Sequence, residues 1–161
     1  DHSVENNIAI TSLSTFANAG VIRQRESRAA VLEQMKRLHL RASAVDLPVK
    51  ALSGGNQQKA ALARWLLRDS GVLILDEPTR GVDIGAKREI YELIDALARS
   101  GKAVLVISSD LPEAIGIGDR LLVMREGRIV KELVSAEATE EDVILHATGA
   151  RAPAPIRETQ E

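Results

Sequence analysis

The stretch Val72-Leu73-Ile74-Leu75-Asp76-Glu77-Pro78-Thr79 decides the fold class of this chain. Four consecutive apolar residues followed by two carboxylates predict a short, buried strand with acidic side chains at its carboxyl end. In open α/β sheets, ligands bind at that end of the strands. Adjacent side chains point in different directions, so one division of labour has Asp76 hold Mg²⁺ while Glu77 polarises an attacking water. Two solvated acids at a strand-to-loop junction are the alternative interpretation.

A second feature lies upstream, in Leu52-Ser53-Gly54-Gly55-Asn56-Gln57-Gln58-Lys59. This octapeptide places a hydroxyl and two glycines directly before a predicted helix. Exposed backbone N–H groups, the helix dipole and the absence of Cβ atoms would make such a turn a cradle for an anion. A bare Ser-Gly-Gly turn is more often an ordinary helix start. Its position 24 residues before the acidic pair makes the combination of the two motifs highly specific.

The rest of the chain alternates between helical and strand patterns. Helices are predicted over residues 28–41, 53–68 and 111–115, between Asp83 and Gly101, and over residues 139–147. Strands are predicted over residues 72–75 and 103–108, and a hairpin over 120–125 and 128–133. The strand–helix–strand alternation in the middle predicts an α/β unit. The first seventy residues are predicted to be all-helical, and residues 149–161 to form a disordered tail.

Composition excludes several classes of protein. Of the 161 residues, 45% are hydrophobic and 27% are charged, which excludes a wholly disordered chain. The net charge of -2 gives no sign of a nucleic-acid partner or an anionic membrane surface. The longest apolar run, Ala103–Ile107, is far shorter than the roughly 18 residues that cross a bilayer. The absence of cysteine excludes a disulfide framework and Cys-ligated metal. Because the chain begins with Asp1 rather than Met, we expect it to be a piece of a longer protein.

These motifs resemble those of ABC-type ATPases. Residues 52–59 are similar to the signature motif, residues 73–79 to the Walker B strand with its following glutamate, and residues 80–83 to the D-loop. The form LSGGNQQK followed by LDEPTRGVDIGAK resembles the second ATPase cassette of tandem-cassette importers for ribose, xylose, galactose and related monosaccharides. The resemblance runs from about Ser3 to about Thr148.

The resemblance implies an α/β fold, a partial P-loop NTPase core with parallel strands. A helical signature subdomain, truncated at its start, would occupy residues 1–70. The C-terminal part of the ATPase core would occupy residues 71–148 and end in a β-hairpin and a C-terminal helix, before a tail at 149–161.

The resemblance also implies roles for individual residues. Asp76 would serve Mg²⁺ and Glu77 would be the general base, while Asp83 would couple two ATP sites. The residues that would contact ATP phosphates across the interface with an opposing cassette are Ser53, Gly54, Gly55 and Gln57.

Two departures from the family pattern stand out. Ser109 occupies the position of the switch histidine, and its shorter, uncharged hydroxyl would contact the γ-phosphate in place of an imidazole. A Walker A loop, G-x-x-x-x-G-K-[ST], is absent, because Gly101-Lys102 is followed by Ala103. We therefore expect the isolated chain neither to bind MgATP well nor to hydrolyse it.

The resulting functional prediction is a fragment of the ATP-binding subunit of a sugar importer. It would contribute signature, Walker B and D-loop to ATP sandwich sites with a second ATPase cassette. Membrane permease subunits and, indirectly, a periplasmic sugar-binding protein would be its partners, at the cytoplasmic face of the inner membrane. Two alternatives are a stand-alone, non-catalytic remnant that docks on another cassette, and a non-transport ABC ATPase. The second would usually carry coiled-coil insertions or basic linkers, and the sequence shows neither.

Overall fold

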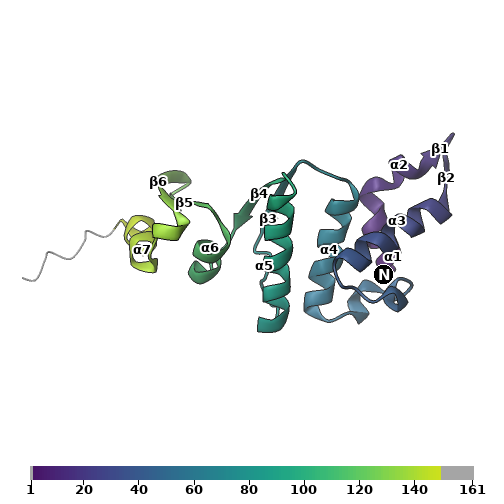
Figure 1. The fold of residues 1–161 in the computed structure, drawn as a ribbon, viewed down its shortest axis with the longest axis horizontal. Helices are drawn as coiled ribbons and strands as arrows, with labels where there is room; N and C mark the ends of the chain where they lie inside the picture. Colours follow the sequence, from purple (N-terminus) through teal and green to yellow (C-terminus); the bar gives the residue numbers. More distant parts are fainter. Residues whose placement is uncertain (1, 150–161) are drawn as a thin grey trace, which may run out of the picture. The chain divides into compact units, whose positions relative to one another are not determined.

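The computed structural model describes residues 2–149, which fall into two compact units. The first unit extends to Ile107 and the second begins at Ser108, so the predicted boundary at residue 70 divides the first unit. No helix among the described residues has the length and apolar character needed to cross a membrane. The elements are coloured along the chain in Figure 1.

The first part of the first unit is a helical cluster. It comprises α1 (Val4–Ala9), α2 (Leu13–Phe16), α3 (Gln24–Arg37) and α4 (Gly54–Leu67), with short 3₁₀ turns between them. Helices α1, α3 and α4 pack against one another around buried side chains. The fully buried apolar side chains contributed by α1 and α3 are Val4, Ile8, Val31 and Met35.

The prediction of an all-helical start is wrong in one place. Strands β1 (Ala17–Asn18) and β2 (Val21–Ile22) form a small antiparallel hairpin within it. Its turn residues Ala19 and Gly20 both have positive φ, 49° and 82°, as in a two-residue type I′ turn. The turn was not predicted because its first position holds alanine, whereas asparagine or aspartate is usual there.

The second part of the first unit is a strand–helix–strand motif. Strands β3 (Val72–Asp76) and β4 (Ala103–Ile107) pair in parallel, with Val72 opposite Ala103 and Asp76 opposite Ile107. Helix α5 (Ile84–Arg99) connects them and buries Ile90 and Ile94. This confirms the predicted parallel α/β unit.

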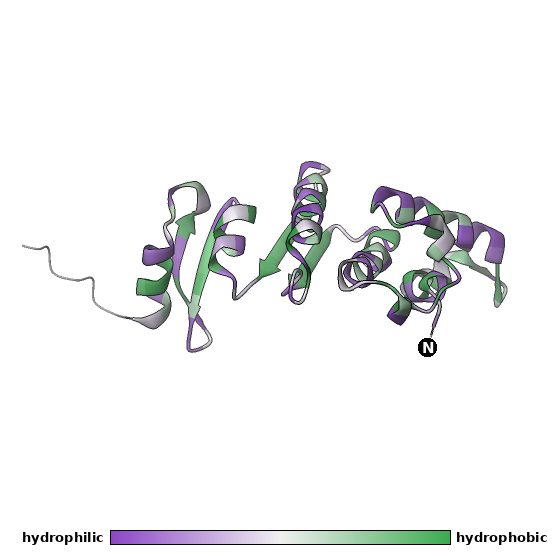
Figure 2. Ribbon diagram, turned by 90° about the horizontal axis from the view of Figure 1, so that it is seen from below, coloured by the Kyte–Doolittle hydropathy of each residue, from purple (hydrophilic) through white to green (hydrophobic). Residues whose placement is uncertain are grey.

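The prediction of a buried strand over residues 72–75 is wrong at alternate positions. Along β3, Leu73 and Leu75 are buried, whereas Val72 and Ile74 are both 65% exposed. On β4, Leu105 and Ile107 are also exposed. Figure 2 shows both strands coloured hydrophobic. Because α5 covers one face, the apolar run is buried only at alternate positions.

The second unit contains α6 (Leu111–Ile117), the antiparallel strands β5 (Arg120–Arg125) and β6 (Arg128–Val134), and α7 (Glu140–Thr148). The hairpin turns at Glu126-Gly127, as predicted, with both residues at positive φ. Helix α7 packs on β5 and begins with a capping box between Thr139 and Asp142. Except for Gly149, which caps α7 in a left-handed conformation, the predicted tail lies outside the described residues.

Candidate functional site

The Ser-Gly-Gly turn begins helix α4. Ser53 is its N-cap, with extended backbone angles, and the Ser53 side chain makes no capping hydrogen bond. The first N–H groups of a helix have no partner within the helix. Gly54 and Gly55 add no Cβ in front of them, so the turn has the features of the anion cradle that the sequence predicts.

Gln57 holds this turn from within. Its backbone N–H donates to the Ser53 carbonyl at 2.8 Å, and its side-chain Nε2 donates to the Leu52 carbonyl at 2.8 Å. An amide NH₂ has two hydrogens, so one N–H of Gln57 stays available after the bond to Leu52. The predicted contact of Gln57 with phosphate would use that second hydrogen.

Three of the predicted residues line one cavity. Ser53 and Gly55 on the α4 side and Asp83 on the α5 side share a hollow of about 360 Å³, which we call the α4–α5 cleft. Its other lining residues are His39, Asn56, Lys59, Gly85, Ala86 and Glu89. The cleft therefore joins the Ser-Gly-Gly turn to the start of α5, two segments separated by β3 in the sequence.

Helices α4 and α5 approach closely along this cleft. A Cβ built on Gly55 would lie 2.6 Å from the Cβ of Ala86, and one on Gly54 would lie 3.3 Å from the Gly81 carbonyl oxygen. One turn further along α4, Lys59 forms an ion pair with Glu89 of α5. These two residues were not singled out from the sequence, although Lys59 lies four residues after Gly55 and so on the same helix face.

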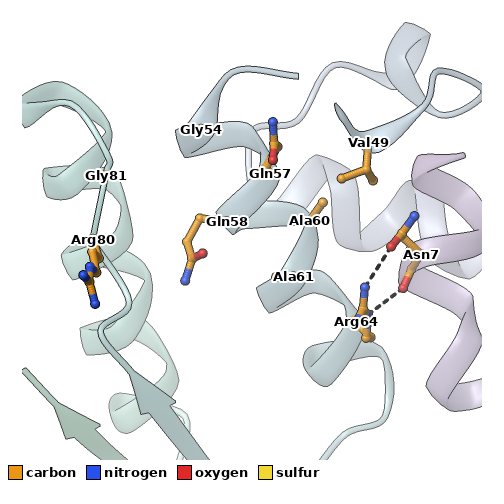
Figure 3. Close-up of a pocket in the computed structure, with 10 residues that line it drawn as sticks. All are labelled: Asn7, Val49, Gly54, Gln57, Gln58, Ala60, Ala61, Arg64, Arg80 and Gly81. Carbon is orange, nitrogen blue, oxygen red and sulfur yellow. Dashed lines mark hydrogen bonds between the residues drawn. The ribbon is translucent and has the colours of Figure 1, made fainter. Parts of the chain in front are cut away.

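Gly54 and Gln57 line a second cavity, also of about 360 Å³. Figure 3 shows α4 crossing it, with Arg80 and Gly81 on the segment before α5 and Asn7 on the opposite side. Arg64 donates to the backbone carbonyl of Asn7 at 2.7 Å and to its side-chain Oδ1 at 2.9 Å. This pair fixes α4 to α1, an anchor between residues 57 positions apart that a local pattern does not reveal.

The acidic pair lies where the sequence predicts, at the carboxyl end of β3. Asp76 is the exposed last residue of the strand, and Glu77 follows it with a positive φ of 48°. The Glu77 backbone N–H donates to the Ile107 carbonyl at 2.8 Å, and its carbonyl accepts from the Arg80 N–H at 3.1 Å. Left-handed backbone is unfavourable for glutamate, so these bonds hold a strained turn. The lining of the two cavities does not include Asp76 or Glu77.

Asp83 and Ser109 complete the predicted set. Asp83 is the N-cap of α5, and its Oδ1 accepts a hydrogen bond from the Ala86 N–H at 2.9 Å. Ser109 lies in the second unit, between β4 and α6. Its neighbour Ser108 hydrogen-bonds through its Oγ with the buried carboxylate of Glu113 and accepts from the Asp110 N–H at 3.0 Å.

Asp76 is the carboxylate that the sequence predicts to hold Mg²⁺. Among the described residues, no group of three or more His, Cys, Asp or Glu side chains is placed to hold one. Mg²⁺ is commonly held by one or two carboxylates together with substrate phosphates, so a single exposed carboxylate at a strand end suits it. Asp76 fits such a partial site.

Comparisons with known proteins give a consistent result. The sequence profile of the ABC transporter family matches residues 1–80. The ribose import ATP-binding protein of Oceanobacillus iheyensis is 48% identical over 92% of this chain and 30% of its own length. Ribose import ATP-binding protein 2 of Rhizobium meliloti is 50% identical over 92% of this chain and 29% of its own length. The chain thus spans less than a third of these relatives.

Solved structures agree with the fold. A putative metal-chelate type ABC transporter in an inward-facing conformation superposes with a TM-score of 0.78 over 92% of this chain and 58% of that one, at 19% identity. A dimeric ATP-binding cassette in a post-hydrolysis state, bound to ADP and Pi, superposes with a TM-score of 0.70 over 83% of this chain and 57% of that one, at 26% identity. The first similarity bears on the fold alone.

Proposed function

This chain belongs to the ABC transporter family, and on that premise we propose that it supplies the signature, Walker B and D-loop segments of ATP sites that power monosaccharide uptake. The observation that carries the proposal is the order of its elements. A Ser-Gly-Gly turn whose N-cap serine makes no side-chain capping bond begins α4, an acidic pair lies at the end of β3, and Asp83 is the N-cap of α5. The proposed class of sugar follows from two relatives that are 48% and 50% identical, both of them ribose import ATP-binding proteins.

The signature turn would bind phosphate through its backbone. The N–H groups at the start of α4 lie at the positive end of the helix dipole. Ser53 would add its hydroxyl, which makes no capping bond, and Gln57 its remaining amide hydrogen. Binding of this kind needs no net positive charge, which agrees with the net charge of -2.

Asp76 and Glu77 would have separate roles in a second ATP site, distinct from the one that the signature turn serves. Asp76 would hold Mg²⁺, which when bound with ATP neutralises charge on the phosphates. Glu77 would orient a water and accept its proton, and the bond from its N–H to Ile107 fixes its backbone. Ser109 would contact the γ-phosphate, and Asp83 would couple the two sites from its position in the α4–α5 cleft.

The whole assembly extends beyond this chain. A second ATPase cassette would supply the Walker A loop opposite the signature turn, and permease subunits would hold the complex at the cytoplasmic face of the membrane. A periplasmic sugar-binding protein would act indirectly through those subunits. The chain by itself would bind MgATP poorly and hydrolyse none.

A substitution at Glu77 tests this function in the full-length protein that contains the chain. We expect Glu77→Gln to retain MgATP binding and to lower the ATP hydrolysis rate by about 100-fold or more, because a neutral amide accepts no proton from water. Steady-state phosphate release and equilibrium nucleotide binding are the two measurements.

Glu126→Gln is the matched control. Glu126 is also a glutamate in left-handed backbone, with a φ of 51°, but it lies in the β5–β6 turn. Its hydrolysis rate should equal that of the wild type. Normal turnover of Glu77→Gln would show that another site does the chemistry. Micromolar MgATP affinity of the isolated 161-residue chain would contradict the expected need for a Walker A loop.

A further inference from the structure

Helices α4 and α5 meet in two layers along the α4–α5 cleft. In the first layer Gly55 lies against Ala86, with no room for a side chain on the glycine. In the second layer Lys59 pairs with Glu89. Because Lys59 is four residues after Gly55, and Glu89 three after Ala86, each helix presents both contacts on one face.

The ion pair differs from the others on α5. The Lys59 side chain is only 8% exposed, whereas Glu89 is 54% exposed. The pairs Arg88–Glu92 and Arg99–Asp95 are exposed and lie within one helix. Such pairs hold no second element in place. A buried ammonium group, by contrast, is destabilising without a partner, so the position of Lys59 depends on the carboxylate from the neighbouring helix.

We propose that Lys59 and Glu89 are positioning residues that fix the signature turn against the D-loop. An apolar contact between helices permits sliding, while a directional ion pair selects one register. The register matters here because Ser53, Gly55 and Asp83 line the same cleft. A slide of α4 along α5 would therefore move the phosphate-facing amides relative to Asp83.

The role of the pair in catalysis rests on the function proposed above, whereas its role in fixing α4 against α5 does not. Lys59 and Glu89 act on the site through the helices and need no contact with nucleotide. Loss of the pair should lower the rate constant for hydrolysis more than it weakens nucleotide binding. The anchoring of ATP by a Walker A loop lies elsewhere in the proposed assembly.

Spin-label distances between α4 and α5 in the 161-residue chain test whether the Lys59–Glu89 pair fixes the two helices. Trp65 of α4 and Ala96 of α5 are exposed, and cysteines in their place would be the only thiols, since the chain has no cysteine. We expect one narrow distance distribution in the otherwise wild-type chain and a broadened or shifted one in Glu89→Gln. Glu92→Gln, which removes the same group from a pair within α5, should leave the distribution unchanged.

Two further variants keep the test decisive if Glu89→Gln fails to fold. Lys59→Met removes the buried charge together with the pair, so it tests the directional contact without leaving an unpaired ammonium group. It should also broaden the distribution. The exchange Lys59→Glu with Glu89→Lys should restore a narrow one. An unchanged distribution in both Glu89→Gln and Lys59→Met would overturn the proposal.

Steady-state kinetics of the full-length protein then test the catalytic role. Glu89→Gln and Lys59→Met should lower kcat by about tenfold, as expected for misplaced groups, with KM for MgATP within about twofold of the wild type. Glu92→Gln should match the wild type. A broadened distribution with unchanged kcat would overturn the positioning role while leaving the proposed function intact. If the wild type hydrolyses no ATP, the proposed function fails. The spin-label distances alone then decide whether Lys59 and Glu89 fix α4 against α5.

Discussion

At the residue scale, Gly55 has two reasons to be glycine. The absence of a Cβ exposes backbone amides at the start of α4, and it also lets α4 approach Ala86 of α5. The first reason concerns a ligand, while the second concerns the folded chain alone. A stability measurement isolates the second reason, because it needs no nucleotide.

We expect Gly55→Ala to destabilise the chain by about 1–2 kcal/mol, because its Cβ would lie 2.6 Å from that of Ala86 and force the helices apart. Gly116→Ala is the control, since Gly116 is in helix α6 and has open space at its Cβ position. Alanine there should stabilise by up to about 1 kcal/mol through helix propensity. Denaturant unfolding of the two variants checks the prediction, and equal effects would contradict the close packing of α4 on α5.

At the scale of elements, the burial of residues along β3 depends on which face of the strand another element covers. Its four apolar residues look alike in the sequence, yet α5 buries only Leu73 and Leu75. Side chains on a strand alternate between faces, so a helix on one side protects every second residue. The face with Val72 and Ile74 is open to solvent in the described chain.

Truncation of neighbouring residues on β3 should therefore have very different effects. Leu73→Ala should destabilise by about 2–5 kcal/mol, because it leaves a cavity under α5. Ile74→Ala should change the free energy of unfolding by less than about 1 kcal/mol, since Ile74 is already exposed. Urea denaturation followed by circular dichroism gives both values. A large loss for Ile74→Ala would mean that another surface covers this face in solution.

At the scale of the whole molecule, an ion-pair cluster makes stability depend on pH. Arg28 of α3 donates to both carboxylate oxygens of Asp46 at 2.8 Å and also pairs with Glu5 of α1. The hydrogen bonds from Arg28 lower the pKa of Asp46 in the folded chain. A lowered folded-state pKa contributes stability above the ordinary pKa of aspartate, and this contribution is lost as the pH falls through the lowered value.

The variant Asp46→Asn should lack this pH-dependent contribution to stability. At pH 7 the urea midpoint of the variant should lie below that of the wild type, and the difference should shrink as the pH falls below 3.8, the ordinary pKa of aspartate. Asp95→Asn is the control, because Asp95 pairs with Arg99 one turn away on the same helix. A difference that stays constant with pH would show that the Asp46 carboxylate contributes through packing and not through charge.

The sequence predicted features whose causes are local. The cap at Asp83 and the β5–β6 turn at Glu126-Gly127 follow from a few adjacent residues, and the structure confirms both. The Lys59–Glu89 pair could not be predicted, because its partners are 30 residues apart and no helical or strand period connects them. The exposure of Ile74 was missed because periodicity in a uniform apolar run does not say which face another element covers.

The backbone of Glu77 offers a reporter that needs no turnover. Its N–H donates to the carbonyl of Ile107, the last residue of β4. A bonded amide proton exchanges with deuterium only when the bond opens. The exchange rate of this one proton therefore measures how often the residue after β3 separates from the end of β4. In a sample that consumes no nucleotide at all, that rate would still record any ligand that tightens or loosens the acidic turn.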